Sequence, residues 1–202
     1  MSLLSIAYLP PVQYYSKLIT YPEINIEQFE HFPKQTYRNR AYIYSPNGRQ
    51  ILTVPLKNRT ERTITKDIRI CYNDPWQKLH WRSMEAAYRR SPYFEYYEDD
   101  LAPFYNEQKH EFLVDLNMEL MQFINSLLKI NVKYRFTSDY EKTYPNVNDF
   151  RNIISPKAEP GADQTFVVKE YSQVFDSRHG FIPNLSIVDL LFNHGPRSLE
   201  YL

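Results

Sequence analysis

Three basic side chains and an amide come together in the pattern of a predicted β-hairpin. Arg38 and Arg40 are two positions apart, so on a strand they share one face, with their roots about 6.6 Å apart. Two guanidinium groups at that spacing can hold two oxygens of a phosphate or carboxylate. Lys57, at the end of the returning strand, adds a third positive charge, and Asn39 and Lys57 can orient the ligand. The alternative is that these side chains form an ordinary solvated face.

His80 and Trp81 lie on the helix expected after the hairpin. His80 falls one turn after Trp76 and one turn before Met84, at the margin of an apolar stripe. An imidazole titrates near neutral pH, so His80 is our candidate for a catalytic general base. The alternative is a hydrogen-bonded core histidine, which is the commoner role of a lone histidine on such a stripe.

Other groups give weaker signals. Cys71 has no base beside it in the sequence, so we interpret it as a small half-buried strand residue and not as a nucleophile. The four glycines form no phosphate-binding loop, and the five histidines form no metal motif, so we predict no metal and no cofactor. Neighbouring carboxylates that could hold a divalent ion, but more often form a solvated helix start, are Glu95, Glu98, Asp99 and Asp100.

The composition is that of a folded globular chain with an aromatic core. Of 202 residues, 43% are hydrophobic and 16% are aromatic, including 18 tyrosines, whose buried rings need partners for their hydroxyls. The 24 basic residues balance 24 acidic ones, which argues against nucleic acid or an anionic membrane as partner. No segment approaches the roughly 20 apolar residues of a membrane span, and a single cysteine suits a reducing compartment. These features predict a cytoplasmic protein and indicate no oligomeric state.

Hydrophobic periodicity and turn residues predict the elements of the first half of the chain. Asn47-Gly48 between two β-prone runs is a strong signal for a two-stranded hairpin. Two prolines end the first apolar run, and Pro11 suits the first position of a helix. Asp74-Pro75 likewise begins a helix. The expected elements are strands at 3–9, 36–44, 51–56 and 64–72, and helices at 12–19 and 76–90.

The second half combines a long amphipathic helix with a polar loop. An apolar stripe predicts a helix over 108–129, and Ser186 caps a final helix that ends at Gly195. Residues 137–164 are polar and contain several prolines, which predicts a long mobile loop. The order of elements favours an α/β or α+β fold, with a mixed sheet flanked by helices in a single domain over 1–202. The remaining expected strands are 132–136, 165–169 and 171–175.

Motifs spread over most of residues 5–106 and over the C-terminal tail resemble those of the WbqC-like family of bacterial proteins, in the variant common in Bacteroidetes. The chain departs from the family pattern at Leu4-Ser-Ile6, where typical members have His-Gln-Pro. Its central region, 137–180, is also shorter and more loop-like. The motifs are Tyr8-Leu-Pro10, Arg38-Asn-Arg40, Leu52-Thr-Val-Pro55, His80-Trp81, Ser91-Pro-Tyr-Phe94 and the tail from Asn184 to Pro196.

The resemblance implies an enzyme of surface-polysaccharide or O-antigen biosynthesis that transfers an acyl or aminoacyl group to a nucleotide-linked amino sugar. Arg38 and Arg40 would bind the anionic part of this small molecule, and His80 would be the base. Tyr8 and Trp81, which belong to the family motifs, would add substrate contacts. The missing N-terminal histidine favours the alternative, a non-catalytic binding or scaffold protein. A deep cavity lined by Arg40 and His80 would support the enzyme, and ion pairs around both would support the alternative.

Overall fold

The parallel and antiparallel strands form two separate sheets. The computed structural model describes residues 2–159 and 161–202. The predicted α/β class is confirmed, but the strands expected in one mixed sheet are divided between two. An antiparallel hairpin consists of β3 (Arg40–Ser45) and β4 (Gly48–Thr53). A parallel sheet, in the order β5-β2-β1-β6, consists of β1 (Ser2–Ser5), β2 (Glu23–Glu27), β5 (Lys133–Phe136) and β6 (Asn148–Asp149).

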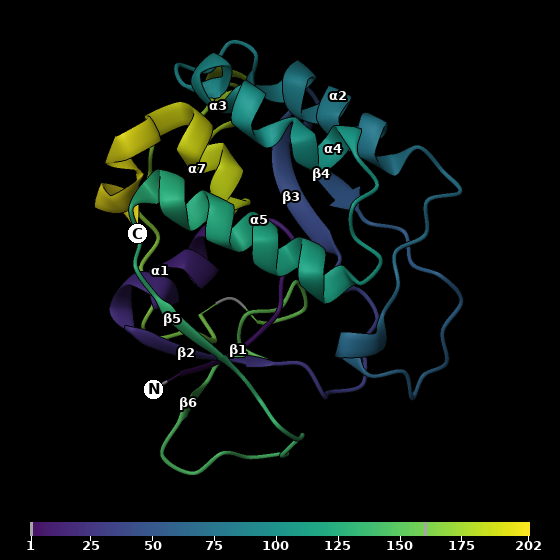
Figure 1. Cartoon of the computed structure of the whole chain (residues 1–202). Helices are drawn as coiled ribbons and strands as arrows, with labels where there is room; N and C mark the ends of the chain where they lie inside the picture. Colours follow the sequence, from purple (N-terminus) through teal and green to yellow (C-terminus); the bar gives the residue numbers. More distant parts are fainter. Residues whose placement is uncertain (1, 160) are drawn as a thin grey trace.

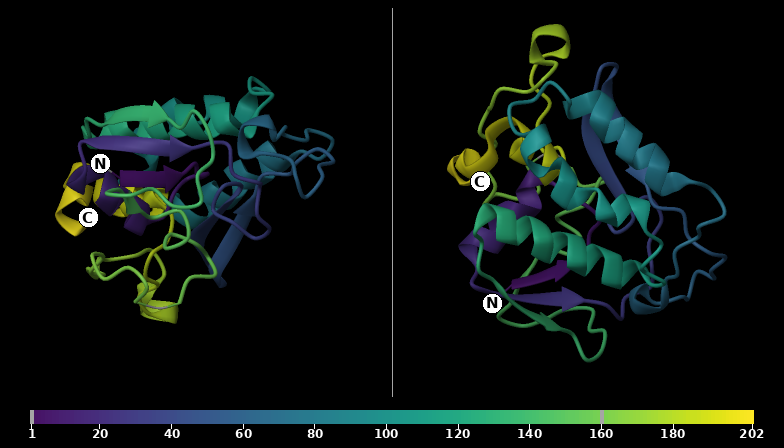
Figure 2. Two further views of the ribbon diagram at one scale, coloured as in Figure 1. Left: turned by 90° about the horizontal axis from the view of Figure 1, so that it is seen from below. Right: turned by 45° about the horizontal axis from the view of Figure 1, so that its top comes forward.

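Helices fill the space around the two sheets. Figure 1 shows the parallel sheet at the bottom, α2, α3 and α4 at the top, and α5 running across the molecule between them. The two chain ends lie on the same side in the views of Figure 1 and Figure 2. The helices are α1 (Val12–Thr20), α2 (Trp76–Tyr88), α3 (Phe94–Leu101), α4 (Pro103–Asn106), α5 (Leu113–Leu128), α6 (Asp176–His179) and α7 (Ile187–His194), with 3-10 turns η1 (Thr65–Asp67) and η2 (Gly195–Tyr201).

The strand order of the parallel sheet reverses beside β1. β1, α1 and β2 form a β-α-β unit, in register from Ser2 opposite Ile24 to Ser5 opposite Glu27. β5 extends the sheet beyond β2, and the chain then returns to place β6 on the other side of β1. In open parallel sheets, ligands bind outside the carboxyl ends of the strands at such a reversal point. The sheet therefore indicates where a ligand site is expected.

Local sequence signals located several elements correctly. Gly48 has a φ of +92°, the left-handed backbone that the hairpin turn needs, and β3 and β4 pair along their whole length. Ser186 caps α7 by accepting a hydrogen bond from the Val188 backbone N–H at 3.4 Å. Gly195 follows α7 with a φ of +52°, and a Cβ there would lie 2.5 Å from the Tyr93 ring. The predicted hairpin and the predicted ends of the last helix are confirmed.

The strand predicted at 64–72 is wrong. This segment forms η1 and isolated bridges because its backbone groups bond to loops from different parts of the chain. The Thr65 N–H donates to the Glu30 carbonyl, whereas the Ile70 N–H donates to the Glu111 carbonyl. Apolar and polar residues alternate in this segment as in a strand, yet its backbone hydrogen bonds are made without a continuous β-ladder.

The strands predicted at 165–169 and 171–175 are also wrong, since neither segment contains one. The second segment is held by side chains instead of a ladder. The Asp189 carboxylate, fully buried at 0% exposure, accepts hydrogen bonds from the Tyr171 hydroxyl at 2.8 Å and from Gln173 Nε2 at 2.9 Å. Burial raises the pKa of Asp189 to about 6, against the lowering effect of these hydrogen bonds.

The core is rich in buried tyrosine rings, as the composition predicts. The hydroxyls of Tyr8, Tyr44 and Tyr88 have hydrogen-bond partners inside the protein. The hydroxyls of Tyr14 and Tyr15 have none among the described residues, although both side chains are at most 2% exposed. The expectation of satisfied hydroxyls is therefore wrong for these two neighbours in α1.

Candidate functional site

A cavity of about 470 Å³ opens where the chain leaves the carboxyl end of β2. Its walls come from the segment after β2, the approach to β3 and the turns after β6, and we call it the edge cavity. Four cationic side chains face a single carboxylate, and the volume lies within the roughly 300–1,000 Å³ of ligand sites. The lining residues are Phe29, Glu30, His31, Pro33, Lys34, Gln35, Thr36, Arg38, Tyr140, Arg151, Asn152, Ser155 and Lys157.

Arg38 is fixed from three sides at the edge cavity. Its Nε and Nη2 donate to Glu30 Oε1 at 2.8 and 2.5 Å. Nη2 also donates to Ser5 Oγ at 2.6 Å, and Nη1 donates to Thr36 Oγ1 at 2.5 Å. A guanidinium has five N–H groups, so one N–H on Nη1 remains without a partner among the described residues. Arg38 is therefore both preorganised and able to donate one more hydrogen bond.

Arg38 and Arg40 do not form the predicted pair. Arg38 lies in a turn before β3, and Arg40 is the first residue of that strand, so strand alternation does not extend to Arg38. Arg40 is not among the residues that line the edge cavity, and its Nε is buried without a hydrogen-bond partner in the described parts of the chain. The second arginine of the cavity is Arg151, for which we found no sequence signal.

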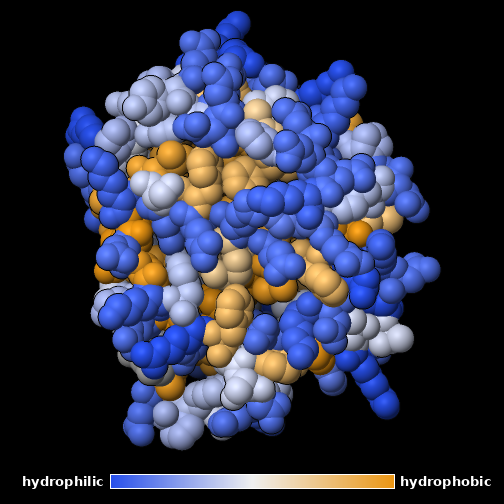
Figure 3. Space-filling view, viewed as in Figure 1, coloured by the Kyte–Doolittle hydropathy of each residue, from blue (hydrophilic) through white to orange (hydrophobic). Residues whose placement is uncertain are grey.

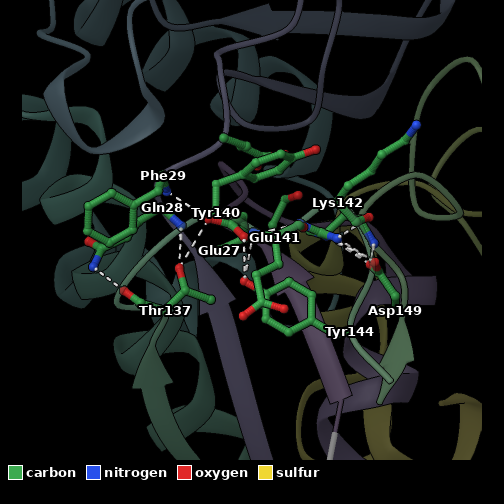
Figure 4. Close-up of polar contacts among 12 residues, drawn as sticks. Glu27, Gln28, Phe29, Thr137, Tyr140, Glu141, Lys142, Tyr144 and Asp149 are labelled. Carbon is green, nitrogen blue, oxygen red and sulfur yellow. Dashed lines mark hydrogen bonds and ion pairs between the residues drawn. The ribbon is translucent and has the colours of Figure 1, made fainter. Parts of the chain in front are cut away.

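Arg151 ties the loop after β5 to the carboxyl end of β2. Its Nη1 donates to Glu27 Oε2 at 3.1 Å and to the Glu141 carbonyl at 3.0 Å. Its Nη2 donates to Asp149 Oδ2 at 2.6 Å and to the Lys142 carbonyl at 3.3 Å, while Nε donates to Asp149. Figure 4 shows Glu27 among the side chains of this loop. Because all five N–H groups are used and its charge is paired with the Glu27 and Asp149 carboxylates, Arg151 forms part of the cavity wall and offers a ligand no further hydrogen bond.

The outer wall of the edge cavity carries exposed polar side chains. Lys34 and Lys157 are both exposed, as is His31. Lys34 lies 3.4 Å from Glu61, but the two side chains are 73% and 88% exposed, and such surface pairs are weak. These three residues could not be predicted from the sequence, because they lie in irregular segments that show neither a hydrophobic periodicity nor a motif.

Asn39 and Lys57 do not line the edge cavity. Asn39 is 9% exposed, and its Nδ2 donates to the Val54 carbonyl at 3.0 Å, which joins the start of β3 to the chain after β4. Lys57 is exposed, and its backbone N–H donates to the Arg69 carbonyl at 2.9 Å. The structure thus gives Asn39 a structural contact and does not bring Lys57 to the cavity with Arg38.

His80 is buried in a network of neutral groups. Its Nδ1 lies 2.9 Å from the Tyr8 hydroxyl, which lies 2.9 Å from the Tyr105 hydroxyl. Burial lowers the pKa of His80 to about 4, against the raising effect of a hydrogen bond with the Thr53 backbone. The imidazole is therefore uncharged at neutral pH. The Trp81 ring lies 5.8 Å from the ring of Tyr105, which extends the aromatic packing around the network.

The three sequence candidates Tyr8, His80 and Trp81 do not line the edge cavity. His80 is 5% exposed and bonded to neutral groups, and neither His80 nor Arg40 has an ion pair with another described residue. These surroundings match the alternative interpretation of His80 as a hydrogen-bonded core histidine. A cavity lined by Arg40 and His80 would have supported catalysis by His80. The edge cavity is not such a cavity, because neither residue lines it.

Other candidate groups do not form a site. Cys71 is half-buried, and its backbone N–H donates to the Pro55 carbonyl at 2.9 Å. Over residues 2–159 and 161–202, no group of three or more His, Cys, Asp or Glu side chains is placed to hold a metal ion.

Within the same ranges no helix combines the length and the apolar character needed to cross a membrane. The face drawn in Figure 3 is largely hydrophilic, with separate hydrophobic patches between the polar side chains.

Fold and cavity together define an α/β protein with a basic cavity at the carboxyl edge of a parallel sheet. The chain belongs to the WbqC-like protein family, whose family model matches residues 7–155 and 161–201. It is similar to the uncharacterized protein Rv1507c of Mycobacterium tuberculosis strain H37Rv. The two are 28% identical over 221 aligned positions, which cover 96% of this chain and 94% of that protein. No solved structure matches the chain.

Proposed function

We propose that this protein binds a nucleotide-linked amino sugar in the edge cavity and transfers an acyl or aminoacyl group to it. The observation that carries the proposal is the position and lining of the cavity, which lies at the carboxyl edge of the parallel sheet and carries the exposed Lys34 and Lys157 beside the Arg38–Glu30 pair. The setting, biosynthesis of a surface polysaccharide, is the one that the resemblance to the WbqC-like family implies.

Cationic side chains, and not a helix N-terminus, would hold the phosphates. The first N–H groups of α1 are already used: Val12 donates to the Leu185 carbonyl and Gln13 donates to Asn184 Oδ1, both at 2.9 Å. The proposed site therefore needs no glycine-rich phosphate loop, which the chain lacks. The free N–H of Arg38 would donate to a phosphate oxygen, with the two exposed lysines adding charge.

We propose His31, which lines the edge cavity, as the general base of this reaction in place of His80. In the proposed reaction, the amine of the sugar attacks the acyl carbonyl carbon and His31 accepts the proton. An amide bond forms, and the bond between the acyl group and its activated carrier breaks, with the carrier keeping the electron pair. His80 is buried and does not line this cavity.

Titration calorimetry with a panel of nucleotide sugars, up to millimolar concentration, tests the binding step. Wild-type protein is expected to bind at least one of them, and Lys34→Ala/Lys157→Ala should bind it about tenfold more weakly. Arg82→Ala, an exposed residue of α2 that does not line the edge cavity, is the matched control and should bind as wild type. Absence of heat with every nucleotide sugar contradicts the proposal.

The second candidate function is that of a non-catalytic binding protein. Two observations favour it: every N–H of Arg151 is bonded within the protein, and Ser5, in the segment where typical family members have His-Gln-Pro, is engaged by Arg38. Mass spectrometry of the nucleotide sugar after incubation with an activated acyl donor separates the two functions. A sugar that binds but gains no acyl mass supports the binding protein.

A further inference from the structure

The Tyr14 hydroxyl is a buried polar group without a hydrogen-bond partner. Tyr14 lies in the first turn of α1 and is 2% exposed, and no described residue accepts from or donates to its Oη. Native proteins rarely leave a buried hydroxyl unsatisfied, because the group loses its hydrogen bonds to water and gains nothing in return. A group of this kind calls for an explanation from its position in the fold.

Tyr14 lines a narrow crevice between the carboxyl ends of β1 and β6, the place where the strand order reverses. The crevice, which we call the inner crevice, has a volume of about 10 Å³, room for one oxygen-sized group. Arg38 lines both the inner crevice and the edge cavity, so the two spaces share this residue. Phe150 and the backbone after β1 supply much of the remaining wall.

The charge of Arg38 reaches the Tyr14 hydroxyl. Burial raises the pKa of Tyr14 well above its usual value, Tyr134 adds to the rise, and the positive charge of Arg38 opposes it. The phenol therefore stays protonated at neutral pH and keeps a proton to donate. Arg38 also has one unused N–H on Nη1, so the inner crevice is lined by two residues that each keep an unused donor.

We propose that the Tyr14 hydroxyl and the unused N–H of Arg38 together bind one anionic phosphate oxygen of the ligand in the edge cavity. This inference rests on the proposed function and names the deep end of the same site. Two donors converging on an oxyanion in a dry crevice make short, charge-assisted hydrogen bonds. The ligand thus satisfies a hydroxyl that the fold leaves without a partner.

Tyr14→Phe removes only this hydroxyl, and α1 offers a matched control. Tyr15 is 0% exposed and its hydroxyl also has no partner among the described residues, but Tyr15 does not line the inner crevice. Both variants are expected to melt at or above the wild-type temperature, because each loses an unsatisfied buried hydroxyl. Only Tyr14→Phe is expected to lose affinity, by about tenfold or more.

The experiment is calorimetry of UDP-N-acetylglucosamine, UDP and inorganic pyrophosphate with wild type, Tyr14→Phe and Tyr15→Phe, with acetate as a carboxylate probe. Weaker binding of UDP and pyrophosphate by Tyr14→Phe alone, together with no competition from acetate, supports the phosphate contact. Equal affinity of wild type and Tyr14→Phe overturns this inference and leaves the proposed function intact. Competition from acetate for the contact has the same consequence. Equal losses in both variants overturn it too, since the cause would then be the packing of α1. No binding by wild type overturns both proposals.

Discussion

The surroundings of His80 and the carboxyl edge of the parallel sheet are both polar, yet they differ in how far their hydrogen bonds are completed. Around His80, the Tyr8 and Tyr105 hydroxyls and the imidazole form a closed chain of neutral groups. At the sheet edge, the groups are charged, and both the Arg38 guanidinium and the Tyr14 hydroxyl keep a donor unused. A buried network whose hydrogen bonds are complete stabilises the fold, whereas one with unused donors is a candidate ligand-binding site.

The same contrast separates the two arginines of the edge cavity. Arg151 uses all of its N–H groups on carboxylates and carbonyls, and its side chain is 4% exposed beside Glu27 at 0%. Arg38 uses all but one. We therefore propose that Arg151 serves stability and that Arg38 serves ligand binding, and this division can be tested by mutation.

The largest expected effect is on stability and comes from Arg151→Met. The variant leaves the buried Glu27 carboxylate without its cation, and breaking a buried ion pair costs about 3–5 kcal/mol. Urea denaturation at pH 7 should show this loss in the free energy of unfolding. Arg82→Met, exposed on α2, is the control and should change it little. A loss below about 1 kcal/mol for Arg151→Met would contradict its assignment as the stabilising arginine.

The next effect concerns pH and the closed network. The folded pKa of His80, about 4, lies below the ordinary value of 6.5, so its contribution to stability is present above pH 6.5 and is lost as the pH falls toward 4. The shift corresponds to about 3 kcal/mol. Denaturation at pH 7.5 and 4.5 should show that the stability advantage of wild type over His80→Gln shrinks by about that amount. An advantage that does not change with pH would show that His80 is not buried as a neutral group.

A smaller effect, of opposite sign in the two regions, comes from removing single tyrosine hydroxyls. Tyr8→Phe takes away the group that joins His80 to Tyr105 and should lower the free energy of unfolding by about 1–3 kcal/mol. Tyr14→Phe removes a hydroxyl without a partner and should not lower it. Thermal unfolding of the two variants side by side measures the contrast. If both variants lose the same stability, the distinction between closed and open networks fails.

The smallest effect on stability is expected from the exposed lysines. Lys34→Ala/Lys157→Ala should change the free energy of unfolding by less than about 0.5 kcal/mol, because both side chains are exposed and the pair between Lys34 and Glu61 is a surface pair. Its loss of nucleotide-sugar affinity should diminish as salt is added, since screening weakens the same charges in wild type. Calorimetry at 50 mM and 300 mM salt tests this, and an affinity gap that does not depend on salt would argue against an electrostatic role.

Elements with a local physical cause were predictable from neighbouring residues alone. The Asn47-Gly48 turn requires a left-handed residue, and Gly48 supplies it; Ser186 caps the last helix with its own side chain. The same neighbouring residues that give these signals also form the structure, so the hairpin, α1, α5 and α7 could be predicted. The family motifs, which are strings of neighbours, were found for the same reason.

The pairing of the strands and the set of residues that line the site could not be predicted, because both depend on contacts between distant segments. β2 (Glu23–Glu27) was missed, and its parallel pairing with β1 and β5 joins segments far apart in the chain. Arg38 donates a hydrogen bond to Ser5 and lines the same cavity as Arg151. The two-residue spacing of Arg38 and Arg40 could indicate neither contact. The burial that lowers the pKa of His80 to about 4 likewise depends on segments that meet only in the folded chain. Local conformation follows from neighbours in sequence, whereas charge pairing, burial and the reversal of strand order depend on contacts that exist only after the chain has folded.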